Sequence, residues 1–157
     1  MQSVKMPAFS IIGISIRTTN ENNQATTDIA GLWQKFLSES LVNEIPNKVD
    51  KTIYSLYTDY DSDHTKPYTA ILGCKVSDVT NIPEGMVSKS FTESNYVKTS
   101  AKGDIMQGLI VNHWSKIFDM DIDRSFQVDF EVFDEKAQNP NDAEVDFYVG
   151  VKNNSND

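Results

Sequence analysis

The spacing of apolar residues predicts the same order of elements twice along the chain, and this order restricts the folds that it can adopt. In the first half, alternating apolar residues predict a strand over residues 9–18. From Asp28, apolar residues recur every three or four positions, as on one face of a helix. Two further strands, 51–60 and 67–76, flank a turn-rich segment and predict a hairpin. The first half therefore reads as a strand-helix-strand-strand unit.

The second half repeats this order. A strand is predicted over residues 88–99, and Gly103 and Asp104 are expected to open a helix. Two strands, 126–134 and 143–152, follow with a turn between them. Two such units packed around one core predict an α+β domain with antiparallel pairing inside each hairpin. The junction between the units is a natural position for a ligand cleft.

Length and composition predict a single domain. A chain of 157 residues with 39% hydrophobic residues can bury one sizeable core, and we expect the domain to span residues 1–152. The polar segment 153–157 should be a disordered tail. The N-terminal segment lacks the charged and apolar regions of a signal peptide, and no apolar run approaches the roughly 20 residues that a membrane span needs. We therefore expect a cytoplasmic protein that does not contact a membrane.

Charge and motif content narrow the classes of partner. Lys and Arg total 14 against 23 for Asp and Glu, a net charge of -9, which disfavours direct binding to nucleic acid and favours cations. The single cysteine, Cys74, lies in an apolar run and should be buried and inert. His64, His113 and Cys74 lack the spacing of metal ligands, and DYDSDH lacks the glycine and glutamate of a calcium loop. We expect neither a metal nor a cofactor.

The predicted strand FQVDFEVFD carries a carboxylate, Glu131, among phenylalanines and valines. Alternation puts Phe130 on the face that points to the main core and puts Glu131 and Phe133 on the other. Tyr148 lies opposite the valine face of the last strand, so Glu131 and Tyr148 are both expected to point away from the main core. The pattern alone leaves two interpretations open, namely a solvent-exposed polar face or a binding site.

Tyrosines concentrate on the first predicted hairpin, at Tyr54, Tyr57, Tyr60 and Tyr68. Tyr57 and Tyr60 would lie on opposite faces of a regular strand. Because a buried hydroxyl needs a partner, tyrosine-rich surfaces often border a partly open cavity. Rings around one carboxylate would bind a lipophilic cation by cation–π attraction and ion pairing. The alternative is an amphipathic hairpin with its tyrosines in solvent.

Several segments resemble the GyrI-like family, also known as the bacterial transcription activator effector-binding domain. They are IIGISIRT, YSLYTDYDSDHTKPYTAILGCKV, DFEVFD and NDAEVDFYVGVK, and the resemblance extends over about residues 5–152. It implies the fold of the ligand-binding half of multidrug-responsive regulators, here in a stand-alone form. It also implies that the family's central glutamate falls on Glu131, with Phe133 where a tyrosine is common, and that Gly150 replaces a frequent proline. The implied ligand-binding residues are Glu131, Tyr148, Tyr68, Tyr57, Tyr60 and Phe133, with Trp114 and Trp33 as further candidates on the helices.

Three functions follow as hypotheses. The favoured one is a non-catalytic module that binds hydrophobic, cationic small molecules, either to sequester them or to act as a sensor through a protein partner. The second is a hydrolase of electrophilic xenobiotics, in which Glu131 would be the general base and Tyr148 or Tyr68 would orient the substrate. The third is a protein-binding regulator such as a gyrase modulator, whose acidic surface would contact a basic partner.

Overall fold

The computed structural model describes residues 2–152, so the predicted tail 153–157 lies outside the described residues. Within these residues, two α-helices and eight strands make up the fold: β1 (Gln2–Met6), β2 (Phe9–Thr18), α1 (Gln24–Ser38), β3 (Ile53–Thr58), β4 (Tyr68–Val76), β5 (Val87–Phe91), β6 (Ser94–Gly103), α2 (Leu109–Phe118), β7 (Arg124–Phe133) and β8 (Ala143–Val151). The strands form one antiparallel sheet in the order β1-β6-β8-β7-β3-β4-β2-β5. This arrangement is the α+β fold predicted from the element order.

The two predicted units are present as β2-α1-β3-β4 and β6-α2-β7-β8. They join where β3 pairs with β7 in the middle of the sheet. The duplication goes further than predicted, because each unit is preceded by a short strand that pairs with the other unit: β1 with β6, and β5 with β2. Each of β5, β6 and α2 begins 85 residues after its counterpart β1, β2 or α1. The single strand predicted over 88–99 is therefore wrong, since a break after Phe91 divides it into β5 and β6.

Both helices begin at other residues than predicted. Helix α1 starts at Gln24, four residues before Asp28, directly after a 3-10 turn. Gly103 ends β6 instead of opening a helix, and Asp104 caps a short 3-10 turn over Ile105–Gln107. Gly108, with φ of 81°, then separates that turn from α2, because a left-handed residue cannot continue a right-handed helix. No helix within residues 2–152 is long and apolar enough to cross a membrane.

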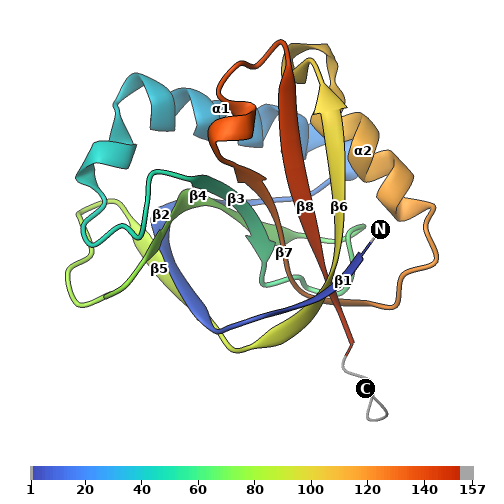
Figure 1. Cartoon of the computed structure of the whole chain (residues 1–157), viewed down its shortest axis with the longest axis horizontal. Helices are drawn as coiled ribbons and strands as arrows, with labels where there is room; N and C mark the ends of the chain where they lie inside the picture. Colours follow the sequence, from blue (N-terminus) through green and yellow to red (C-terminus); the bar gives the residue numbers. More distant parts are fainter. Residues whose placement is uncertain (1, 153–157) are drawn as a thin grey trace.

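The sheet carries packed side chains on both faces, in place of the one main core that we expected. Figure 1 shows α1 and α2 on the same side of a strongly curved sheet. Between α1 and the sheet, Phe36 of the helix belongs to one cluster with Ile12 and Leu72. Between α2 and the sheet, Ile117 of the helix belongs to another with Val145 and Phe147. The opposite face carries a third cluster of buried and partly buried side chains: Val4, Phe9, Tyr54, Leu56, Phe91, Tyr96 and Phe130. Its members come from both ends of the sheet, which the curvature brings together.

Candidate ligand-binding site

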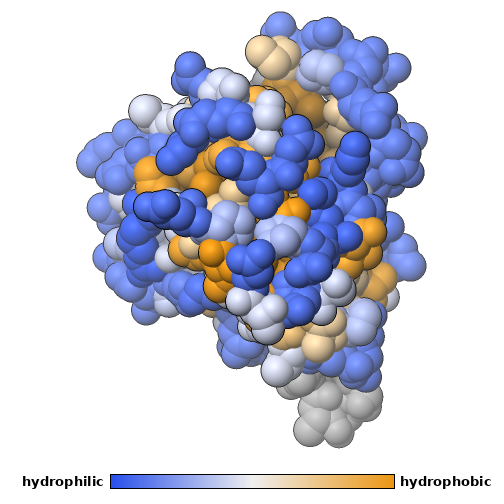
Figure 2. Space-filling model, turned by 90° about the vertical axis from the view of Figure 1, so that its left-hand side faces the viewer, coloured by the Kyte–Doolittle hydropathy of each residue, from blue (hydrophilic) through white to orange (hydrophobic). Residues whose placement is uncertain are grey.

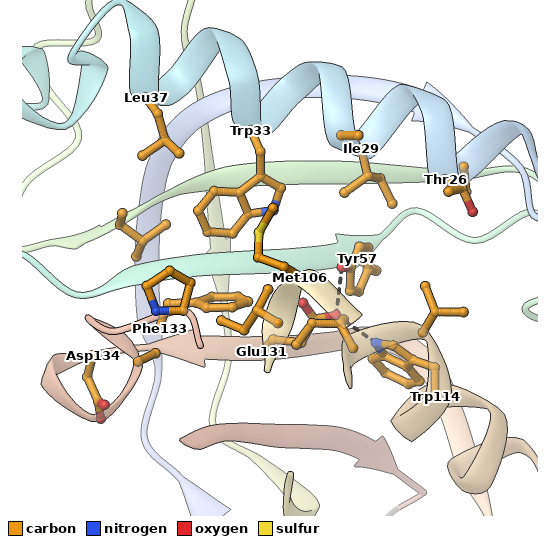
Figure 3. A pocket seen from close by; sticks show the side chains of 18 of the residues that line it. Thr26, Ile29, Trp33, Leu37, Tyr57, Met106, Trp114, Glu131, Phe133 and Asp134 are labelled. Atoms are coloured by element: carbon orange, nitrogen blue, oxygen red, sulfur yellow. Dashed lines mark hydrogen bonds between the residues drawn. The ribbon is translucent and has the colours of Figure 1, made fainter. Parts of the chain in front are cut away.

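A cavity of about 1130 Å³ lies on the helical face of the sheet, between α1 and α2. Its volume is slightly above the range typical of small-molecule sites, roughly 300–1,000 Å³. Figure 3 shows Ile29, Trp33 and Leu37 pointing from α1 toward the strand that carries Glu131 and Phe133. Most side chains around the space are apolar or aromatic, as in ligand sites generally.

The mouth of the cavity also carries apolar side chains. Leu37 on α1, Met106 before α2 and Val111 on α2 all line the cavity and are largely exposed. Figure 2 shows the end of the molecule near the C-terminal end of α1, where apolar side chains lie in hollows between hydrophilic ones. An apolar ligand could therefore keep contact with protein from the mouth to the floor of the cavity.

Glu131 lies at the floor of the cavity and is only 1% exposed. One of its oxygens, Oε2, accepts hydrogen bonds from the Tyr57 hydroxyl at 2.7 Å and from the Trp114 Nε1 at 2.6 Å. Both donors are neutral, and no lysine or arginine among residues 2–152 forms an ion pair with it. Burial raises the pKa of Glu131 to about 7, although the two hydrogen bonds act in the opposite direction.

A second buried carboxylate, Asp129, lies two residues earlier in β7, and therefore on the same face as Glu131. It differs from Glu131 because it has a cationic partner: its Oδ2 is 2.8 Å from Nη2 of Arg124. The Tyr60 hydroxyl donates to the same oxygen, and the Gly150 amide donates to Oδ1 at 2.8 Å. The cavity side of β7 thus carries two buried carboxylates: Asp129, which is paired with a cation, and Glu131, which lines the cavity and is not.

Seven of the eight candidate residues line this cavity: Glu131, Tyr57, Tyr60, Tyr68, Phe133, Trp114 and Trp33. Rings of several of them meet edge to face, with centroids of Tyr57 and Trp114 5.9 Å apart and those of Trp33 and Phe133 4.8 Å apart. The cavity therefore brings together candidate side chains from five different elements: α1, α2, β3, β4 and β7.

Tyr148 is the exception, and the expectation that it lies beside Glu131 is wrong. Residues directly opposite each other in antiparallel strands share a face, and the register pairs Tyr148 with Phe130, and Glu131 with Phe147. Tyr148 therefore points to the opposite face of the sheet, where its ring stacks on Phe130 at 4.8 Å. Alternation correctly placed Phe130 and Glu131 on opposite faces of β7, but it did not provide the pairing between the two strands.

Tyr57 and Tyr60 point into the same cavity, although a regular strand would place them on opposite faces. Strand β3 ends at Thr58, and Asp59 has a φ of 52°, which interrupts the alternation. Tyr68 lies next to both and donates its hydroxyl to Asn20. The first hairpin therefore supplies three tyrosines to the cavity, whereas Tyr54 packs on the other face.

Sequence reasoning missed Arg124 and Asp129, and it considered His64 only as a metal ligand. His64 lines the cavity and stacks on Phe118 with ring centroids 4.2 Å apart. Asp129 could have been found from its shared face with Glu131. Arg124 could not, because an irregularity in the pairing of β7 with β8 means that alternation does not predict which face Arg124 lies on. Within residues 2–152 there is no group of three or more His, Cys, Asp or Glu side chains placed to bind a metal ion.

Comparison with protein families gives a match over nearly the whole chain. Residues 4–151 match the family model Cass2, described as integron-associated effector-binding protein. The chain belongs to this family. A relative in Bacillus subtilis (strain 168), YobU, has a name that proposes a role in transcription regulation; it is 25% identical over 144 residues, which cover 89% of this chain and 90% of YobU.

Solved structures agree with this effector-binding family. An integron cassette protein from the mobile metagenome of Vibrio cholerae is 27% identical and superposes with a TM-score of 0.73, over 96% of this chain and 95% of that one. SAV2435, solved with bound tetraphenylphosphonium, is 17% identical with the same TM-score, over 96% of this chain and 93% of SAV2435. The chain thus has the GyrI-like effector-binding fold, and its family supports small-molecule binding as its general function.

Proposed function

We propose that the cavity binds a hydrophobic organic cation, with Glu131 as its counter-ion. The observation that carries this proposal is that Glu131 is 1% exposed and accepts hydrogen bonds only from the neutral side chains of Tyr57 and Trp114. A buried carboxylate without a cationic partner is unfavourable, so the empty protein keeps the pKa of Glu131 high. A ligand with a positive charge removes this penalty, whereas a neutral ligand of the same shape does not.

The aromatic lining supports the same ligand class. The rings of Tyr57, Tyr68 and Trp114 surround the approach to Glu131, and aromatic faces attract cations. The net charge of -9 favours the approach of cations over anions. The relative SAV2435 was solved with tetraphenylphosphonium, a hydrophobic cation, which is consistent with this proposal for a protein of the same fold.

The Arg124–Asp129 ion pair supports the proposal, because it is an example within this protein of a cation bound by a buried carboxylate. The guanidinium carbon of Arg124 lies 4.4 Å from the ring centroid of Phe126, and its Nη2 contacts the buried carboxylate of Asp129. A cation that lines the cavity is thus already held by a carboxylate, which also accepts a hydrogen bond from a tyrosine hydroxyl, and by aromatic rings. Glu131 has the same kinds of neighbour but no cation.

A titration with two ligands of equal shape tests the proposal. 4-Phenylbenzamidine carries a positive charge and 4-phenylbenzamide does not. Tryptophan fluorescence should report both, since Trp33 and Trp114 line the cavity, and calorimetry confirms the affinities. We expect the amidine to bind the wild type at least about tenfold more tightly than the amide, a difference of roughly 1.4 kcal/mol.

Two variants assign that preference to one residue. In Glu131→Gln the amidine and the amide should bind about equally, because the carboxylate is replaced by an amide of the same shape. Glu135→Gln is the matched control, since Glu135 lines the same cavity but is exposed at its mouth. The proposal is wrong if the wild type binds both compounds equally, or if Glu135→Gln removes the preference and Glu131→Gln does not.

Hydrolysis of an electrophile is a second candidate, favoured by the pKa of Glu131 near 7, which suits a general base at neutral pH. Tyr148 cannot take part, because it lies on the other face of the sheet, and Tyr68 is the remaining candidate to orient a substrate. Incubation with styrene oxide, followed by assay of the diol, tests this function. Diol formation above the uncatalysed rate that is lost in Glu131→Gln would support it, and no acceleration would exclude it for this substrate.

A further inference from the structure

Two carboxylate sites of similar construction lie on the cavity side of β7: Glu131 lines the cavity itself, and Asp129 lies behind Arg124, which lines it. Asp129 and Glu131 are 0% and 1% exposed, and they lie on the same face of β7. Each accepts a hydrogen bond from a tyrosine of the first hairpin, Asp129 from Tyr60 and Glu131 from Tyr57. By their surroundings, both sites could hold a cation.

We infer that Asp129 forms a second cation subsite, that Arg124 occupies it permanently, and that the cavity is thereby restricted to ligands with a single positive charge. This inference rests on the proposed function, because it assumes that Glu131 binds the charge of the ligand. It makes Arg124 a specificity-determining residue, although no ligand atom need touch it.

The environment of Arg124 is that of a bound cation. Its guanidinium lies 4.4 Å from the ring centroid of Phe126 and within 6 Å of those of Trp114 and Phe118, at 5.8 and 5.9 Å. Its ion pair with Asp129 is shielded, with the two side chains 7% and 0% exposed. Trp114 connects the two subsites, since its ring faces Arg124 and its Nε1 donates to Glu131.

Only one of the three guanidinium nitrogens of Arg124 has a hydrogen-bond partner among residues 2–152. Nη2 donates to Asp129, but Nε and Nη1 are buried and have no hydrogen-bond partner among residues 2–152. Most of its stabilisation must therefore come from the carboxylate and the rings, which are the elements that would bind any planar cation. An amidinium of a ligand is the closest chemical match to the group that fills this subsite.

One uncompensated buried carboxylate then remains for the ligand. The other acidic residues that line the cavity, Asp50, Asp134 and Glu135, lie at its mouth, where they are exposed or half-buried and where Lys51 is also present. Water and salt screen charges at such positions. A second positive charge on a ligand would therefore find no buried partner and would be repelled by Arg124.

Benzene-1,4-dicarboxamidine, with two amidinium groups on one ring, provides the test because Asp129 and Glu131 are only two residues apart on one strand. Its partner is the analogue in which a carboxamide replaces one amidinium. Calorimetry should show that wild type binds the dication no more than about twofold more tightly than the monocation, which is the statistical advantage of two equivalent ends. In Arg124→Met the dication should bind at least about tenfold more tightly than the monocation, because Asp129 becomes available.

The double variant Arg124→Met, Asp129→Asn is the matched control, because it removes both charges and should return the ratio to that of wild type. A dication that binds wild type about tenfold more tightly than the monocation would overturn the inference, as would equal ratios in the single and double variants. If Arg124→Met is too unstable to titrate, the rise in melting temperature with each probe gives the same comparison. Absence of any monocation binding to wild type would instead overturn the proposed function itself.

Discussion

The indole Nε1 of Trp114 donates a hydrogen bond to the Glu131 carboxylate at 2.6 Å, so that α2 and the central strand β7 meet at the floor of the cavity. Trp114 belongs to an apolar helix stripe, and Glu131 to a strand rich in phenylalanine and valine. Neither the helix stripe nor the strand pattern predicts that these two side chains meet. Their contact makes a buried carboxylate tolerable in the empty protein while leaving it without a positive charge.

The stability of the protein should depend on pH through Glu131. Its pKa is about 7 in the folded chain, against an ordinary value of 4.5. Between these values the unfolded chain loses a proton that the folded chain keeps, so the free energy of unfolding falls as pH rises from about 4.5 to about 7, and this contribution then stays constant. Glu131→Gln removes the penalty and should be more stable than wild type at about pH 8, by on the order of 1–3 kcal/mol.

Urea denaturation at several pH values measures this difference. It should shrink as the pH is lowered and vanish below about pH 4, where Glu131 is protonated in both the folded and the unfolded chain. Glu135→Gln serves as the control, since Glu135 is exposed. A gain in stability that is the same at every pH would mean that the effect of the substitution is not electrostatic.

Tyr57→Phe should weaken cation binding by about three- to tenfold at neutral pH, because it removes a hydroxyl that stabilises the ionised Glu131. The same change should raise the pKa of Glu131 further, which NMR of the labelled carboxyl carbon would show. Tyr54→Phe is a matched control from the same strand, since Tyr54 points to the opposite face of the sheet. Equal effects from both substitutions would argue against a specific role for the Tyr57 hydroxyl.

Tyr148→Ala should leave the affinity for 4-phenylbenzamidine within about twofold of wild type while lowering the free energy of unfolding by on the order of 1–3 kcal/mol. The reason is its stacking on Phe130, on the face away from the cavity. Phe133→Ala is the counterpart on the cavity side, where the ring packs against Trp33, and it should lower the affinity. Isothermal calorimetry and thermal unfolding separate the two effects. Loss of binding in Tyr148→Ala without loss of stability would contradict the register of β7 and β8.

Much of the fold could be predicted because side-chain periodicity is a local property. Alternation located β2, β3, β4, β7 and β8, and the helical stripes located both helices. Strand β1 was not predicted because only five residues form it and three of them are exposed. The division of β5 from β6 was also missed, since both strands are rich in polar residues and give a weak pattern.

The site was predicted less completely because it depends on how strands pair. Alternation identified which residues share a face with Glu131 within its own strand, and the resemblance to a family drew attention to the aromatic residues around it. The register between β7 and β8 decides that Phe147, not Tyr148, is its neighbour, and no local pattern contains that information. Arg124 was missed for a similar reason, since its position depends on the irregularity between Arg124 and Asp129.

The most direct test of the central claim is the number of protons released when the cation binds. At about pH 7, Glu131 with a pKa of about 7 is roughly half protonated in the empty protein, and a cation beside it should drive it to the ionised form. Calorimetry of 4-phenylbenzamidine in buffers of different ionisation enthalpy should then show release of about half a proton by wild type and none by Glu131→Gln. Binding without proton release, or equal release by the two proteins, would contradict the assignment of Glu131 as the counter-ion of the ligand.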